Sequence, residues 1–425
     1  MIPPPSTRSP IALSTRELLI ACISVLIVFT IGVGLKASGS RWTAATDAWR
    51  LGGDFVELYT AGRVVNEGRA DQLYDLALEE QISRELVPRA GPLRRAFAYP
   101  PFVAMLFQPL AALPFSLAFI VFSVATPIVF LGALVLLTRS FGPPAGDERA
   151  LAMLAGLSFF PFLGYTWLGA QISVIGLAAV ALGLSEENGG RPFTSGLALS
   201  MCFYKPSLII LIVPMLAATG SLRQLAGMAT GGAALALLCV AYTGIPSTLA
   251  FVDKLLGTVS RSVSTEGLFN AYRYVDLNAF FRLLPYGRST VGYLVLAVVA
   301  SAAVAALVRL WIRSRNGDRT VRRLVWAATL TFSLVLNIYT PFYDTILVVP
   351  AAVLAVAAIR EAGWQGWNRL APMLVVVYIT PWIAEFCART FRVQIYTLAL
   401  GAFGMLLLRE AATRTAATSR TIPQV

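Results

Sequence analysis

Long apolar stretches dominate this chain and are separated by short polar segments. The first apolar run extends from Leu18 to Leu35, close to the ~20 residues that an α-helix needs to cross a bilayer. Because lipid offers backbone groups no hydrogen-bond partners, such runs predict membrane-spanning helices. Further runs occur at 100–113, 116–138, 150–163, 170–185, 194–217, 224–243, 289–310, 324–338, 342–359, 370–383 and 392–408. We therefore predict an all-α, polytopic integral membrane protein of about twelve transmembrane helices, with 1–425 forming a single transmembrane domain.

The N-terminal segment, 1–16, is rich in Pro and Ser and precedes the first apolar run. A cleaved signal peptide is the competing interpretation of that run. The run is longer than the apolar region of a signal peptide, and it lacks a convincing cleavage site before the polar loop. We therefore predict that it is the first span, with the amino end inside.

The charge of the loops predicts how the chain is oriented. The loop RLWIRSRNGDRTVRR (309–323) is strongly basic, and basic loops remain on the cytoplasmic side. Counting spans from this loop in both directions places both termini inside. The same count places on the outer side the first loop at 36–98, the 139–149 loop, a second large loop at 244–288, the 339–344 turn and the 384–391 loop.

The first outer loop, 36–98, differs from the basic loop in its charge. It holds nine basic and nine acidic side chains, so it lacks the Lys/Arg excess of a cytoplasmic loop. Its segments 54–68 and 70–86 have apolar residues at helical spacing, with Gly68 as a stop signal between them. We predict two short amphipathic helices on the outer membrane face.

Composition agrees with the apolar pattern and excludes several kinds of chemistry. The chain is 57% hydrophobic and 13% charged, with a mean hydropathy of +0.71. The net charge of +12 is explained by basic cytoplasmic loops, so we predict no nucleic-acid partner. The four cysteines lie in apolar runs without close spacing, and the chain has no histidine. A structural disulfide, a Cys- or His-ligated metal and a His general base are therefore not expected, which leaves carboxylates, Tyr or Lys for acid–base work.

Two acids at the start of the polar interval are candidates for catalysis. Asp54 follows two glycines, which allow a sharp turn and a close approach to a ligand. Glu57 lies one helical turn later on the same face. Asp54 could act as a general base for an acceptor hydroxyl, or it could simply cap the helix that follows. Both roles are compatible with the spacing.

Lys205 lies near the middle of the apolar run 194–217 and is followed by a proline. An ionisable group at such a depth suggests a functional site, and a cation there could hold a lipid-linked phosphate. A lysine that extends to the membrane interface is the alternative.

Several other polar residues are candidates for contacts with a substrate, each with a structural alternative. The segment 270–282 mixes charged and aromatic residues, which could bind sugars or anionic headgroups or could form an interfacial helix. The motifs AYPPF, which contains Tyr99, and YTPFYD, which contains Tyr343 and Asp344, could equally well mark helix starts. The amide of Gln171 could form a hydrogen bond between helices. The candidates are Tyr99, Gln171, Arg273, Asn278, Arg282, Tyr343 and Asp344.

The order of these motifs resembles a known enzyme family. GGDFVELYTAGRVVNEG, FAYPPFVAMLFQPLAALP, GAQISVIGLAAVALGL, GLALSMCFYKPSLIILIVP and TPFYDTILVVP occur in the order seen in glycosyltransferase family 87. The resemblance covers roughly 50–350. This family is similar to the polyprenyl-phosphate-mannose-dependent mannosyltransferases, and it implies a GT-C-type helical bundle.

The resemblance implies an inverting transfer of a sugar, mannose or another hexose or pentose, from a polyprenyl-phosphate donor to a lipid or glycan acceptor. The site would face the periplasmic or outer side of a bacterial inner (plasma) membrane. Asp54 matches the family's general base and Lys205 a donor-phosphate ligand, which Arg273 or Arg282 would assist. Glu57, Tyr99, Gln171, Asn278, Tyr343 and Asp344 would contact substrate. No cofactor or obligatory metal is implied.

Two alternatives to a transferase remain at this point. A transporter or flippase of a lipid-linked saccharide would also need outer polar residues and an intramembrane cation, although the inverted repeats typical of transporters are not visible. A catalytically inactive, lipid-binding member of the family is the other. The donor sugar, the acceptor and the oligomeric state do not follow from the sequence.

Overall fold

The computed structural model describes residues 14–39, 53–87, 97–143, 146–263, 271–287, 289–315 and 317–420. Within these ranges the regular elements are helices, and the one β-type pairing is an isolated bridge between Tyr274 and Pro341. The all-α prediction is confirmed. The helices are α1 (Thr15–Gly39), α2 (Phe55–Asn66), α3 (Leu76–Leu86), α4 (Pro101–Ala111), α5 (Phe115–Phe141), α6 (Asp147–Leu157), α7 (Ser173–Asn188), α8 (Pro192–Ser200), α9 (Ile212–Ala218), α10 (Leu222–Val263), α11 (Leu277–Leu283), α12 (Thr290–Arg313), α13 (Arg319–Val335), α14 (Val348–Glu361), α15 (Trp367–Phe391) and α16 (Ile395–Arg420).

Seven helices of the described residues are long and apolar enough to cross a membrane. They are α1, α5, α10, α12, α14 together with the preceding turn, α15 and α16. The number becomes eight if α6 and the short helix η3 (Pro161–Trp167), which meet at 42°, are one bent span. The chain is an integral membrane protein, as predicted.

The predicted number of about twelve spans is not confirmed. The run 100–113 forms α4, which has only 11 residues. The runs 170–185 and 324–338 form α7 and α13, of 16 and 17 residues. α4 is thus far shorter than the ~20 residues that a span needs, and α7 and α13 lie at the lower limit of the roughly 17–25 residues seen in spans. The run 224–243 is longer than predicted, because α10 continues past a kink at Gly244 into the expected outer loop.

The predicted span at 194–217 is a hairpin rather than a crossing helix. Ser195, near the start of α8, accepts a hydrogen bond from Gln224 at 2.9 Å, and Gln224 follows shortly after the end of α9. The two ends of this segment therefore lie side by side. Between α8 and α9 the chain forms only short 3-10 helices, because Pro206 cannot continue the helical hydrogen bonding.

The 139–149 loop lies at the end of the bundle opposite to the one predicted. The Phe141 carbonyl accepts a hydrogen bond from Arg360 at 2.9 Å, and Arg323 of the basic loop forms an ion pair with Glu361. The end of α5 therefore lies beside the basic loop, not opposite to it. The reason is that the short helix α4 does not cross, which reverses the side of the loops that follow it until the hairpin at 194–217, which also does not cross and restores the predicted side.

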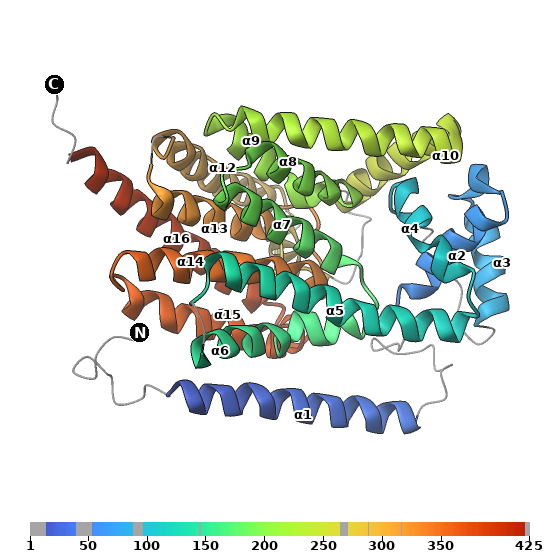
Figure 1. Cartoon of the computed structure of the whole chain (residues 1–425), viewed down its shortest axis with the longest axis horizontal. Coiled ribbons are helices and arrows are strands. Elements are labelled where there is room, and N and C mark those ends of the chain that lie inside the picture. Colours follow the sequence, from blue (N-terminus) through green and yellow to red (C-terminus); the bar gives the residue numbers. More distant parts are fainter. Residues whose placement is uncertain are drawn as a thin grey trace.

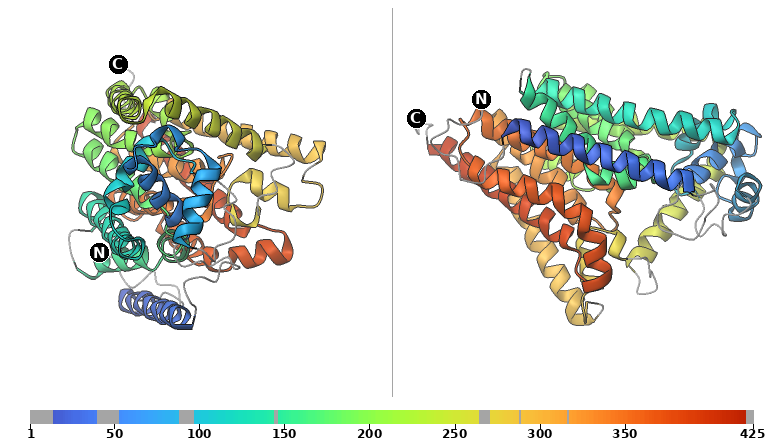
Figure 2. Two further views of the ribbon diagram at one scale, coloured as in Figure 1. Left: turned by 90° about the vertical axis from the view of Figure 1, so that its right-hand side faces the viewer. Right: turned by 90° about the horizontal axis from the view of Figure 1, so that it is seen from below.

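The two amphipathic helices of the first loop are present as predicted. They are α2 and α3, with Gly68 between them at φ +72°. α3 buries Leu78 and Ile82 and exposes Gln81. Figure 2 shows that α2 and α3 cover one end of the bundle.

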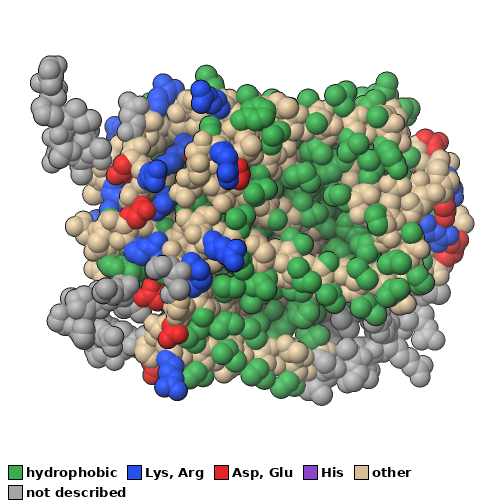
Figure 3. Space-filling model, viewed as in Figure 1, with side chains coloured by type: hydrophobic (Ala, Val, Ile, Leu, Met, Phe, Trp, Pro, Cys, Tyr) green, Lys and Arg blue, Asp and Glu red, His purple; other side chains and the backbone are tan. Residues whose placement is uncertain are grey.

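The two ends of the molecule differ in charge from its middle. α1 begins and α16 ends at the same end, and α2, α3 and α4 lie at the other end (Figure 1). On the face shown in Figure 3, charged side chains gather toward the two ends, and those at the end of α1 and α16 are mainly Lys and Arg. Hydrophobic side chains cover the surface between them, as a surface in contact with lipid requires.

Candidate functional site

Most of the predicted site residues lie where a helix begins or breaks. Asp54 precedes α2, and Gln171 lies between η3 and α7. Lys205 separates η4 (Met201–Tyr204) from η5 (Pro206–Ile209), and Asp344 belongs to η7 (Phe342–Leu347). Irregular backbone is tolerated within a membrane protein where other protein segments bury it or where it lines a cavity. The breaks therefore bring polar groups together inside the bundle.

Asp54 occupies the position of an N-cap, but its side chain does not cap α2. Its Oδ2 accepts a hydrogen bond from Nε2 of Gln171 at 2.6 Å, and its backbone N–H donates to the Gly169 carbonyl at 3.2 Å. Gly53 is required for this approach: its φ is +27°, and a Cβ atom would lie 2.0 Å from the Gly169 oxygen. The glycine before Asp54 thus permits a close approach of two backbone segments.

Lys205 forms an ion pair with Asp344. The Lys205 side chain is 12% exposed and that of Asp344 is 1% exposed, so the pair is buried and Lys205 does not extend to an interface. Ser173 donates a hydrogen bond to Oδ1 of Asp344 at 2.9 Å. The Lys205 ammonium also lies 4.7 Å from the centre of the Tyr343 ring and 5.5 Å from that of Tyr339, distances at which a cation is attracted to an aromatic face.

One short turn holds both acids. Gln171 binds Asp54, and Ser173, two residues later, binds Asp344. Ala170 in the same turn has φ +51°, a left-handed conformation that is uncommon for a residue with a side chain. Oε1 of Gln171 is buried and has no hydrogen-bond partner among the described residues. This amide oxygen could therefore accept a hydrogen bond from a substrate hydroxyl next to Asp54.

Tyr99 lies between the first loop and the Lys205 segment. Its ring stacks on Tyr204 with 6.2 Å between ring centres. Burial raises the pKa of Tyr99 well above its ordinary value, and the charges of Asp54, Asp344 and Glu57 raise it further. Tyr99 is therefore a neutral hydrogen-bonding group close to these acids.

The segment that follows α10 is fixed against the 338–344 turn. The N–H of Val275 donates to the Thr340 carbonyl at 2.9 Å, and the Asp276 carboxylate accepts from the N–H of Thr340 at 2.9 Å. Asn278 donates to the carbonyl of Ile338 at 3.3 Å. The predicted outer loop and the YTPFYD turn are thus joined, as their candidate roles would require.

The two candidate arginines lie on either side of this junction. Arg282 of α11 lines a small hollow together with Asn278 and Tyr339, and Tyr339 is one of the two rings that Lys205 faces. Arg273 extends instead toward Glu385 of α15, with 4.0 Å between Nε and Oε1. Of the two arginines, Arg282 is thus the one that lies beside a ring facing Lys205.

A second polar cluster surrounds Glu385 and was missed by the sequence analysis. Glu385 accepts hydrogen bonds from Tyr165 and from Arg389, and Arg389 lies over the Tyr272 ring at 4.2 Å from its centre. The ring of Tyr165 stacks on Phe342 at 4.8 Å, which connects this cluster to the turn of Asp344. The sequence signal that could have identified Glu385 is an acidic residue close to an apolar run.

Ser173 was also missed, although it lies two residues after Gln171 in the same motif. A serine at a helix start is ordinarily explained as local structure. Its contact with Asp344 joins residues that are far apart in the chain, so the sequence offered no sign of it.

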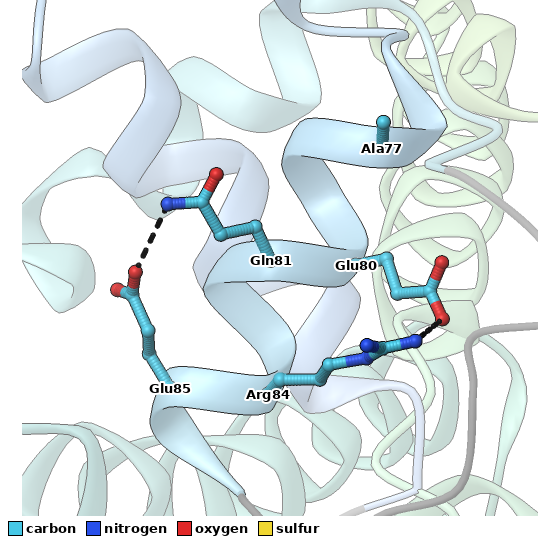
Figure 4. A pocket seen from close by; sticks show the side chains of 5 residues that line it. All are labelled: Ala77, Glu80, Gln81, Arg84 and Glu85. Atoms are coloured by element: carbon cyan, nitrogen blue, oxygen red, sulfur yellow. Dashed lines mark hydrogen bonds and ion pairs between the residues drawn. The ribbon is translucent and has the colours of Figure 1, made fainter.

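The hollow on the outer face of α3 is not part of this site. Figure 4 shows that Gln81 pairs with Glu85 and that Arg84 pairs with Glu80, each one helical turn apart. Such pairs are ordinary on a solvated helix face. Within the described residues, no group of three or more His, Cys, Asp or Glu side chains is placed to hold a metal ion.

The sequence from 97 to 337 matches the profile of glycosyltransferase family 87. The matched segment contains Tyr99, Gln171 and Lys205, whereas Asp54 and Asp344 lie outside it. Searches of curated proteins and of solved structures gave no match. Because the match covers more than half of the chain, this membrane protein belongs to glycosyltransferase family 87 and is a glycosyltransferase.

Proposed function

We propose that this glycosyltransferase moves a sugar from a polyprenyl-phosphate donor to a hydroxyl of a lipid or glycan acceptor, with inversion at the sugar. The observation that supports this most strongly is the placement of Asp54. Its carboxylate accepts a hydrogen bond from Gln171. Ser173 of the same turn donates to Asp344, which in turn forms the ion pair with Lys205. A base and a cation are the two groups that such a transfer requires.

In the proposed reaction the acceptor oxygen attacks the anomeric carbon and Asp54 takes the hydroxyl proton. The bond between that carbon and the phosphate oxygen breaks, and polyprenyl phosphate departs with the electron pair. The hydrogen bond from Gln171 and the backbone bond to Gly169 orient the Asp54 carboxylate for this task. Positioning of this kind is a major part of general-base catalysis.

Cations would stabilise the phosphate as it departs. The charge of Lys205 is balanced by Asp344 in the absence of a ligand, so a bound phosphate would have to share or replace this partner. Arg282, which adjoins the Tyr339 ring, would assist Lys205. Arg273 would first have to leave Glu385.

The other candidates would contact the two substrates. Tyr99 and Tyr343 could pack against sugar rings, since both rings lie close to the Asp54 and Lys205 groups. Glu57, Gln171, Asn278 and Asp344 would supply hydrogen bonds. The proposal includes no cofactor and no metal, and it places the site on the outer face of a bacterial inner membrane.

The test is transfer of a radiolabelled sugar from synthetic polyprenyl-phosphate-mannose, -glucose and -arabinose, measured in membranes that contain the protein. We expect the wild type to use one of these donors, and the donor that it uses identifies the sugar. Asp54→Asn should reduce transfer by about 10²-fold or more, because a general base contributes about 10²–10⁴-fold.

The matched control is Asp71→Asn, since Asp71 is an exposed acid of the same loop. This variant should retain wild-type transfer. Near-normal transfer by Asp54→Asn would remove Asp54 from the role of base. A wild type that moves the labelled donor across the bilayer without transferring its sugar would support the flippase alternative instead.

A further inference from the structure

A fully buried carboxylate lies outside the site described above. Glu79 of α3 is 0% exposed, whereas the adjacent Glu80 pairs with Arg84 on the outer face (Figure 4). Oε2 of Glu79 accepts a hydrogen bond from the N–H of Phe97 at 2.7 Å. Oε1 is buried without a hydrogen-bond partner among the described residues. Burial of an incompletely paired acid is costly, so protonation of Glu79 stabilises it in this position.

The bond from Glu79 fixes the segment that carries Tyr99. Phe97 packs against the rings of Tyr74 and Tyr99, with 6.0 Å and 5.7 Å between ring centres. The Tyr74 hydroxyl also donates to the carbonyl of Tyr99 at 2.7 Å. Tyr99 in turn stacks on Tyr204, the residue that precedes Lys205. Residues of α3 and the turn before it thus hold one side of the candidate site.

We propose that Glu79 is a positioning residue for sugar transfer: by holding the N–H of Phe97 it keeps the 97–100 segment, and with it the Tyr99 ring, against Tyr204. Glu79 itself does not touch the substrate. The proposal rests on the proposed function, because Tyr99 is one of the residues proposed to contact substrate there.

The charge of Glu79 makes this role dependent on pH. Burial raises the pKa of Glu79 to about 7; the Phe97 N–H and the ammonium of Lys254 on α10 oppose the shift, and Asp75 adds to it. Tyr74 is the other titratable side chain beside it, and Lys254 lies over its ring at 5.4 Å from the centre. Glu79 is therefore neutral below about pH 7 and charged above it.

The direction of the effect follows from linkage. The folded protein holds the Glu79 proton more tightly than the unfolded chain does, so this contribution to stability is present at low pH and is lost as the pH rises through about 7. Ionisation strengthens the bond from the Phe97 N–H, but the cost of burying the charge outweighs this gain, since the net shift of the pKa is upward; α3 should therefore separate from the 97–100 segment more readily above this transition. The fixed position of Tyr99 is thus expected below, and not above, this transition.

The experiment uses the full chain in lipid nanodiscs between pH 6 and pH 8.5. Hydrogen exchange of the Phe97 amide, corrected for the intrinsic pH dependence, reports whether the segment is held, and the sugar-transfer assay reports its effect. In the wild type, protection and transfer rate should both fall by about threefold or more between pH 6 and pH 8. In Glu79→Gln, which stays neutral and can still accept from Phe97, protection of Phe97 should be independent of pH over this range, and transfer should fall less than in the wild type.

Two further variants make the result specific. Glu79→Leu lacks the acceptor, so protection of Phe97 and transfer should be low at every pH. Glu80→Gln, the control, should behave as the wild type. Burial also raises the pKa of Asp276 to about 7. Asp276 binds Thr340 and Ala279 rather than the 97–100 segment, so a change in the exchange of Phe97 reports the titration of Glu79 and not that of Asp276.

A wild-type pH dependence of the Phe97 exchange in Glu79→Gln, or wild-type protection of Phe97 in Glu79→Leu, would overturn the proposal. If the wild type transferred no sugar from any donor, the proposed function and the role of Glu79 in transfer would both fail. The exchange of Phe97 would still show independently whether Glu79 holds the segment.

Discussion

At the scale of single residues, the Lys205–Asp344 pair is the most deeply buried ion pair among the residues that the structure describes. Taking both charges out of water is costly, and their mutual attraction offsets this cost only while both are present. The hydrogen bond from Ser173 and the two tyrosine rings around Lys205 provide additional partners. The pair therefore constrains what can be replaced at either position.

We predict that Lys205→Met destabilises the protein by about 3–5 kcal/mol, because it leaves the Asp344 charge buried and unpaired. The double variant Lys205→Met/Asp344→Asn removes both charges and should recover most of this loss, while sugar transfer remains absent. Thermal unfolding in detergent, analysed as a double-mutant cycle, measures the coupling.

The control for this cycle is Arg84→Met, which breaks the surface pair with Glu80. The Arg84 side chain is 65% exposed, so its loss should cost less than about 1 kcal/mol. A Lys205→Met variant as stable as Arg84→Met would show that the buried pair does not contribute as proposed.

At the scale of elements, the site depends on how helix breaks are held together. The turn between η3 and α7 binds both acids. The segment after α10 is fixed to the 338–344 turn mainly by Asp276, whose carboxylate accepts from the N–H of Ala279 at 2.8 Å and from that of Thr340 at 2.9 Å. Because this carboxylate is buried, its loss would leave two backbone donors without partners.

Asp276→Ala should therefore lower the stability by about 1–3 kcal/mol for each donor that stays buried and unpaired. It should also reduce sugar transfer, since Tyr339 and Tyr343 of the released turn face Lys205. The measurements are thermal unfolding and the transfer assay on the same preparations.

Ser289→Ala serves as the comparison, because Ser289 caps α12 through the N–H of Gly292 and forms no contact with the site. Loss of such a cap costs about 1 kcal/mol, and transfer should be unaffected. Equal losses of transfer in the two variants would argue against a specific role for the Asp276 junction.

At the scale of the whole molecule, both the charges and the chain path distinguish the two ends of the bundle. The basic loop, the end of α5 and the end of α14 lie together at one end, and α2, α3 and α4 lie at the other (Figure 1). Basic residues are retained on the cytoplasmic side of a membrane. The α2–α3 end is therefore expected to face outward.

Cysteine labelling in intact cells tests this orientation. In a Cys387→Ser background, in which the three remaining cysteines are buried, a membrane-impermeant maleimide should label Gln81→Cys from outside. Arg315→Cys should react only after permeabilisation, because Arg315 lies in the basic loop. The reverse pattern would place the candidate site on the cytoplasmic side.

Much of the fold could be predicted from the sequence because lipid imposes a strong and local constraint. Apolar runs without charges must form helices that satisfy their own backbone groups, and the periodicity of 54–68 and 70–86 predicted α2 and α3 correctly. The number of crossings could not be predicted in the same way. A short run such as α4 and a run broken at Pro206 look apolar in sequence, but their length and contacts prevent them from spanning.

The sequence by itself determined the class of protein and most of the candidate site residues. A charge such as Lys205 can be recognised in an apolar run because burying it in a membrane costs free energy. Only the tertiary structure decided which of them meet: Asp54 with Gln171, and Lys205 with Asp344. It also brought Ser173 to Asp344 and Glu79 to the N–H of Phe97. The physical reason is that pairing of buried charges depends on contacts between segments far apart in the chain, which no local pattern encodes.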